Sequence, residues 1–234
     1  MADLRSQFGT RAMDDAQIDV GLRAYMLKVY NYMGSGVMLT FAIAWAVAQS
    51  PAVASAVMSM GLILILAAFG LVFFMSARIH KISATTAQAC FWAYSTLFGV
   101  ILSTYFLVYT GESIARVFFI TAATFGSMSL YGYTTKRDLT SLGSFLAMGM
   151  IGLLIAIVVN MFLASSALHF AVSVIGVLIF VGLTAFDTQK IKEIYLVSDS
   201  GEVAAKKSIM GALKLYMDFI GIFIYLMALF GGRE

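Results

Sequence analysis

The chain has 234 residues, of which 61% are hydrophobic and 12% charged, and its formal net charge is +3. Soluble domains carry about 25% charged residues, so this composition excludes a soluble globular protein and places the chain in a membrane. The small net charge gives no indication of a nucleic-acid surface. The single cysteine, Cys90, cannot form an internal disulfide.

Seven apolar runs are long enough to cross a bilayer, which takes about 20 residues per helix. They cover residues 30–49, 53–75, 84–108, 116–131, 142–163, 168–186 and 209–230. Helices are expected because backbone amides in lipid must bond within the protein, and the runs lack the alternation of barrel strands. The sequence predicts an all-α, polytopic protein with an amino-terminal cytoplasmic segment, residues 1–29, and a seven-helix transmembrane domain, residues 30–234.

The positive charges alternate along the chain. Twelve of the fifteen lysines and arginines lie in the amino-terminal segment and in the second, fourth and sixth connections. By the positive-inside rule, the amino terminus is expected in the cytoplasm and the carboxyl terminus outside. The first thirty residues lack the apolar core and cleavage site of a signal peptide, so no cleaved signal is expected.

Two aspartates stand beside the last two apolar runs. Asp187 lies about 28 Å along a helix from Leu168, which places it at the cytoplasmic edge of the hydrocarbon. In the last span Lys214 is best placed near the cytoplasmic interface, with Asp218 one turn deeper. The two carboxylates are therefore expected at similar depth. The apolar stretch 219–230 spans only about 18 Å, so we expect the other helices to surround the last one.

A carboxylate at this depth should be paired, hydrated or protonated, because an isolated charge costs on the order of several kcal/mol. Three cationic side chains lie within reach of these two carboxylates. Lys214 shares a helix face with Asp218, Arg78 ends the second span, and Lys190 follows Asp187 by one turn. If the aspartates face each other, they cannot both ionise freely and should share a proton. A plain interfacial role for Asp187 stays open.

Several uncharged polar residues lie within the spans, among them one glutamine in the third and one asparagine in the fifth. Gln88 and Asn160 are expected to form hydrogen bonds between helices rather than to bind a ligand. No spacing of histidine and cysteine typical of a zinc site occurs in the sequence.

Three segments carry a family resemblance: SLYGYTTKRDLTSLGSFLAMGMIGLLIA at 129–156, GLTAFDTQKIKEIY at 182–195 and GALKLYMDFIGIF at 211–223. They resemble the bacterial branch of the Bax inhibitor-1 family, and the similarity runs from the first span to the carboxyl terminus. The resemblance implies seven helices with the last in the centre, and a pH-sensitive calcium leak gated by two aspartates. It assigns this pair to Asp187 and Asp218, and the arginine that competes for Asp187 to Arg78. Relatives commonly read LDFIN where this chain has MDFIG, so Gly221 departs from the pattern.

The favoured hypothesis is a passive, pH-sensitive calcium-permeable leak channel or transporter that is no enzyme and needs no cofactor. A proton shared by Asp187 and Asp218 locks the last two helices together and closes the cytoplasmic side. Loss of the proton makes the carboxylates repel, and Arg78 then captures Asp187. Calcium takes six to eight oxygens and two carboxylates supply at most four, so calcium binding should be weak and transient. The expected partners are membrane lipids, calcium ions and protons, without nucleic acid; the sequence indicates no protein partner.

Three other functions are considered. An intramembrane aspartyl protease also uses two aspartates, but its second one follows a GxGD pattern, whereas Asp218 follows Leu215, Tyr216 and Met217. A retinal protein needs a mid-span lysine, and Lys214 is expected near the interface. A non-transporting scaffold that modulates other membrane proteins is the main alternative, with nothing in the sequence for or against it.

Overall fold

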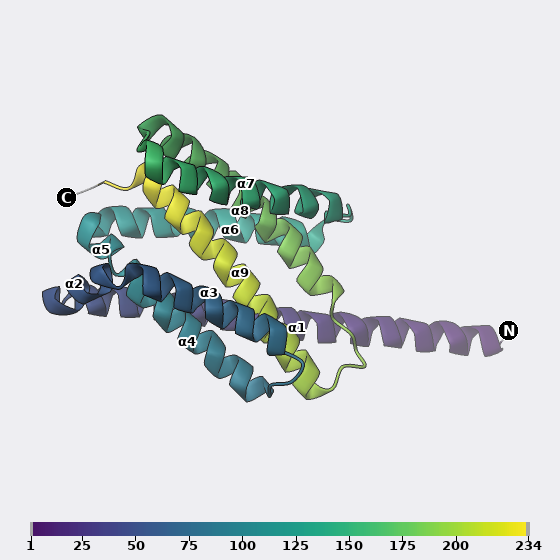
Figure 1. The fold of residues 1–234 in the computed structure, drawn as a ribbon. Helices are drawn as coiled ribbons and strands as arrows, with labels where there is room; N and C mark the ends of the chain where they lie inside the picture. Colours follow the sequence, from purple (N-terminus) through teal and green to yellow (C-terminus); the bar gives the residue numbers. More distant parts are fainter. Residues whose placement is uncertain (1, 233–234) are drawn as a thin grey trace.

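The structure is a computed structural model that describes residues 2–232, with side chains described for residues 20–50 and 52–232. Its described residues form only helices, turns and loops. The helices are α1 (Ala2–Ala48), α2 (Pro51–Ser59), α3 (Gly61–Arg78), α4 (Ala84–Leu102), α5 (Tyr105–Val108), α6 (Gly111–Thr134), α7 (Thr140–Leu163), α8 (Ser166–Glu193) and α9 (Gly201–Phe230) (Figure 1).

Within residues 2–232, seven helical segments are long and apolar enough to cross a membrane, which confirms the predicted all-α fold with seven spans. They are Val20–Ala48, Gly61–Arg78, Ala84–Val108, Gly111–Thr134, Thr140–Leu163, Ser166–Glu193 and Gly201–Phe230. The α3–α4, α6–α7 and α8–α9 connections share one end of the bundle, called the basic end below, and the carboxyl terminus lies at the other end (Figure 1).

The boundaries differ from the sequence prediction at the first two spans. The second run is divided at Met60 into the short α2, which starts at Pro51, and α3. Helix α1 begins well before residue 30, and Tyr25 and Val29 are buried in the core. Packing with the bundle therefore starts before residue 30, while the predicted division of the chain at residue 29 stays a prediction.

Helix α9 occupies the centre of the bundle. It packs against α1, α4, α6 and α8, and Figure 1 shows it passing diagonally between the other helices. Its consecutive residues Phe219, Ile220, Gly221, Ile222 and Phe223 are all buried, so α9 is covered on every side there. The prediction of a central last helix is confirmed. The outer helices α3 and α7 instead carry many exposed apolar side chains, as lipid-facing helices do.

Polar side chains join the helices at buried positions. Tyr216 of α9 donates to Thr40 of α1, with 2.7 Å between their oxygens, and Thr40 also lies 2.8 Å from the carbonyl oxygen of Ser95 in α4. Tyr32 of α1 donates to Gln88 of α4 over 3.4 Å, as expected for a bond between helices. These bonds fix α1, α4 and α9 relative to one another.

Asn160 differs from the expectation. Its Oδ1 accepts from the backbone N–H of Ser165 at 3.0 Å, so it stabilises the turn after α7. Ala164 in this turn adopts a left-handed conformation with φ of 48°, and the chain direction reverses there into α8. Backbone groups at a helix end lack partners within the helix, so a polar side chain there bonds to them rather than to another helix, which explains the difference.

Helices α6 and α8 approach each other closely at Gly132. A Cβ atom at Gly132 comes within 2.2 Å of the backbone oxygen of Ala185, so only glycine fits there without a shift. Gly126 of the same helix has nothing within 4 Å of such an atom. The contact holds α8 in place only two residues before Asp187.

Gly132→Ala is expected to lower the free energy of unfolding by about 1–3 kcal/mol, because the added methyl group pushes α6 from α8. Gly126→Ala is the matched control and should be neutral or stabilising by up to about 1 kcal/mol. Reversible denaturation of detergent-purified protein measures both. Equal stability of the two variants contradicts the close contact.

Candidate functional site

The FDTQ motif near the end of α8 places one carboxylate at the helix interface. Thr188 and Gln189 of the motif are buried, while the side chain of Asp187 is 14% exposed. Thr188 Oγ1 lies 3.0 Å from Ser129 Oγ of α6, which in turn lies 2.7 Å from the hydroxyl of Tyr30 in α1. This chain of hydroxyl groups fixes the rotation of α8 and hence the direction of Asp187.

The second carboxylate is buried in the middle of α9. Asp218 is 3% exposed and follows Lys214 by one helical turn. The bond from Tyr216 to Thr40 holds the intervening turn against α1. Burial of Asp218 therefore results from the central position of its helix.

The two carboxyl groups adjoin each other and interact electrostatically across the α8–α9 interface. Lys214 Nζ lies 3.6 Å from Asp187 Oδ1 and its side chain is 50% exposed. Oδ2 of Asp218 is buried and has no hydrogen-bond partner among the described residues. The site thus combines two acids, one ammonium group and one unsatisfied carboxyl oxygen.

A cavity of about 450 Å³ contains this group. Five helices contribute to its wall: α3, α4, α7, α8 and α9. Its lining residues are Phe69, Tyr94, Phe98, Met150, Leu154, Phe180, Leu183, Asp187, Lys214, Tyr216, Met217, Asp218, Ile220, Gly221, Ile224 and Tyr225. All its charged groups come from α8 and α9, so the carboxylates face an otherwise apolar and aromatic space.

Two of the three cations expected beside the aspartates have no ion pair with them in the structure. Arg78 is the last residue of α3 and is exposed; it forms no ion pair with the described residues. Lys190 pairs with Glu193 on its own helix at 2.7 Å. The structure therefore brings Asp187, Asp218 and Lys214 together, and Lys214 pairs across helices with Asp187.

Gly221 lies close to the pair and packs against the ring of Phe180. A Cβ atom at Gly221 comes within 2.5 Å of this ring. The asparagine that the family resemblance led us to expect at this position therefore has no room here unless Phe180 moves. The departure from the family pattern changes the wall of the cavity.

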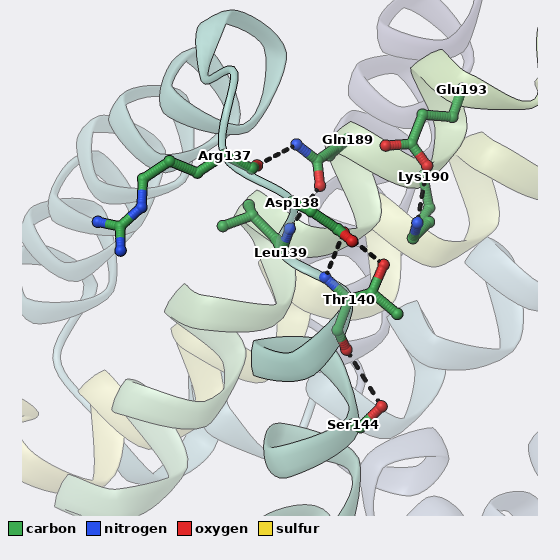
Figure 2. Close-up of polar contacts among 8 residues, drawn as sticks. All are labelled: Arg137, Asp138, Leu139, Thr140, Ser144, Gln189, Lys190 and Glu193. Atoms are coloured by element: carbon green, nitrogen blue, oxygen red, sulfur yellow. Dashed lines mark hydrogen bonds and ion pairs between the residues drawn. The ribbon is translucent and has the colours of Figure 1, made fainter.

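Gln189 holds the α6–α7 connection, a role that the sequence analysis missed. Figure 2 shows its amide between α8 and this connection: Oε1 accepts from the N–H of Leu139 at 2.9 Å, and Nε2 donates to the carbonyl of Arg137 at 2.8 Å. A buried amide that donates and accepts suits an irregular backbone with both kinds of unsatisfied group. Its only signal in the sequence is its place as the last residue of the FDTQ motif.

Asp138 of the same connection stabilises the start of α7. Its Oδ1 accepts from the side-chain hydroxyl of Thr140 at 2.6 Å and from the backbone N–H of Thr140 at 2.8 Å (Figure 2). These bonds lower the pKa of the Asp138 carboxyl below its ordinary value. A lowered pKa means that the ionised form is favoured in the folded state, so this contribution is present at neutral pH and disappears only in acid.

Gln189→Ala is expected to free the α6–α7 connection, because it removes both bonds and leaves two backbone groups without partners, at a cost of about 1–3 kcal/mol. The measurement is hydrogen exchange of the Leu139 amide, which should become faster. Ser144→Ala, which removes a bond within α7 only, should leave that amide unchanged. If the Leu139 amide exchanges at the wild-type rate in Gln189→Ala, Gln189 does not anchor the α6–α7 connection.

The described residues contain no group of three or more histidine, cysteine, aspartate or glutamate side chains able to hold a metal ion. Calcium needs roughly six to eight oxygens, and the aspartate pair supplies at most four. Fold and site together define a polytopic helical membrane protein with an acidic pair buried between its last two helices.

Comparison with known proteins places the chain within this class. The family described as inhibitor of apoptosis-promoting Bax1 matches residues 22–234. Protein RP147 of Rickettsia prowazekii is 48% identical over 227 residues, which cover 96% of each chain. The inner membrane protein YbhL of Escherichia coli is 47% identical over 219 residues, covering 92% of this chain and 94% of YbhL. The chain therefore belongs to the Bax inhibitor-1 family, which is a family of membrane proteins and is not known as an enzyme family.

Proposed function

We propose that the protein is a pH-sensitive calcium-permeable leak channel or transporter of a bacterial inner membrane, gated by Asp187 and Asp218. One observation supports this above all: the two carboxyl groups adjoin each other at the wall of a cavity that contains one cation, Lys214. Acidic groups buried in a membrane span are functional by default, because their burial is costly.

The charges explain how one proton controls the site. With a single proton shared by the pair, one negative charge faces the Lys214 ammonium group and the buried site is neutral. Loss of that proton leaves two negative charges and one positive charge. The extra charge repels α8 from α9 and attracts cations, so the site opens and becomes attractive to calcium at the same step.

Two cations take different parts in this cycle. Lys214 pairs with Asp187 in the present arrangement, which corresponds to the closed form. Arg78, exposed at the end of α3, captures Asp187 once the pair has separated. Calcium passes as the transported ion, held by the two carboxylates together with carbonyl groups and water.

The orientation follows from the basic end of the bundle. The distribution of lysine and arginine supports a cytoplasmic position for this end and for the amino terminus, with the carboxyl terminus outside. The site then responds to cytoplasmic pH: acidification closes it and alkalinisation opens it.

Calcium flux into proteoliposomes, measured over a pH series, tests this function. Wild-type flux is expected to rise with pH. Asp187→Asn and Asp218→Asn should both flatten this response, because neither retains two titrating acids. Glu202→Gln, which alters an exposed ion pair with Lys206 near the start of α9, is the control and should respond like the wild type.

Two outcomes contradict the proposal. If both asparagine variants keep the wild-type pH response, the pair is not the gate. If no flux occurs at any pH and a stoichiometric partner protein co-purifies with the chain, a non-transporting scaffold replaces the leak. Cleavage of a membrane-spanning substrate by the purified protein supports an aspartyl protease instead.

A further inference from the structure

The cavity at the aspartate pair continues into a second chamber. This chamber measures about 430 Å³ and shares five lining residues with the first cavity. The shared residues are Phe69, Tyr94, Phe98, Met217 and Ile224. The two chambers therefore adjoin along α3, α4 and α9.

The two chambers differ in chemical character. Asp187, Lys214 and Asp218 line only the first one. The second chamber is lined by apolar side chains and by Tyr94 and Tyr105. The combined space is thus charged at one end and apolar along the rest, which is the pattern of an amphiphilic molecule.

The mouth of the first chamber faces the surface of the spans. Phe69 of α3 and Leu154 of α7 both line this cavity and are 56% and 50% exposed. They belong to the helices whose exposed apolar side chains face lipid. A molecule dissolved in the membrane can therefore reach the aspartate pair from the side.

We propose that this space binds an organic monocation carried on an apolar body, with its charged head at Asp218. The unpartnered Oδ2 of Asp218 is buried at the cavity wall and requires a donor or a positive charge. Aromatic side chains around it, including Phe98, Phe180 and Tyr225, offer ring faces to a cation. The volume falls within the range of roughly 300–1,000 Å³ of small-molecule sites.

The charge balance selects a cation over a neutral or anionic ligand. The charged groups at the cavity are two aspartates and Lys214, and its other titratable groups are the phenols of Tyr94, Tyr216 and Tyr225. The lining residues from α3 and α7 are apolar. A monocation replaces the shared proton and restores neutrality, so cation and proton compete for the same carboxyl groups.

The test compares two ligands that differ only in the head group, phenylbutylamine and phenylbutanol. They are titrated into protein purified in nonionic detergent, and the heat of binding to empty micelles is subtracted. The wild type is expected to bind the amine at least about tenfold more tightly than the alcohol. Binding of the amine should strengthen as the pH rises through the range in which the amine remains charged.

Two variants remove different parts of the site. Asp218→Asn should abolish the preference for the amine, because it removes the charge that faces the head group. Leu154 is half-exposed, so folding tolerates a larger side chain there. Leu154→Trp should weaken the binding of both ligands, because it narrows the mouth of the first chamber. Glu202→Gln should bind like the wild type.

Equal affinity of the wild type for amine and alcohol overturns the proposal. So does amine binding that is unchanged in Asp218→Asn, or in a folded Leu154→Trp. The measurement uses no calcium and no ion gradient, so it does not depend on the proposed leak. A failed flux assay does not contradict the proposed ligand site, and a failed binding assay does not contradict the proposed leak.

Discussion

Two carboxyl groups and one ammonium group meet at one cavity beside the α8–α9 interface, and this unequal number of charges constrains the rest of the site. Asp218 is 3% exposed and one of its oxygens has no partner among the described residues. Burial of such a site costs little free energy only when its charges balance. One proton or one organic monocation can each provide the balance, and the net negative charge that remains without them attracts calcium, so the same imbalance links gating, transport and ligand binding.

The surrounding structure anchors the helical turns that carry these groups. Gly132 lets α8 approach α6, Thr188 bonds to Ser129 of α6, and Tyr216 bonds to Thr40 of α1. These contacts flank Asp187 and Asp218 in sequence, so each acid lies on a well-anchored turn. The basic end is anchored separately by Gln189, which ties the α6–α7 connection to α8. The acids can therefore respond to charge without unfolding of their helices.

Hydrophobic runs and family motifs were enough to predict seven spans and a central last helix, because burial in lipid leaves a strong pattern in the sequence. The role of the two aspartates stays a prediction. Side-chain pairing was harder to predict. Lys214 shares a face with Asp218 by spacing, yet its ion pair is with Asp187 on the neighbouring helix. Gln189 and Asn160 bond to irregular backbone at helix ends. Such partners depend on how helices rotate and where they end, which periodicity does not determine.

The most direct test of the central claim is infrared difference spectroscopy of the protein in lipid, which detects the carbonyl stretch of a protonated carboxyl group. The account predicts one such band for the aspartate pair, present at low pH, lost as the pH rises and absent in Asp218→Asn. A wild-type protein with no protonated carboxyl band at any pH where it is folded contradicts the shared proton. A band that persists unchanged in Asp218→Asn contradicts it equally.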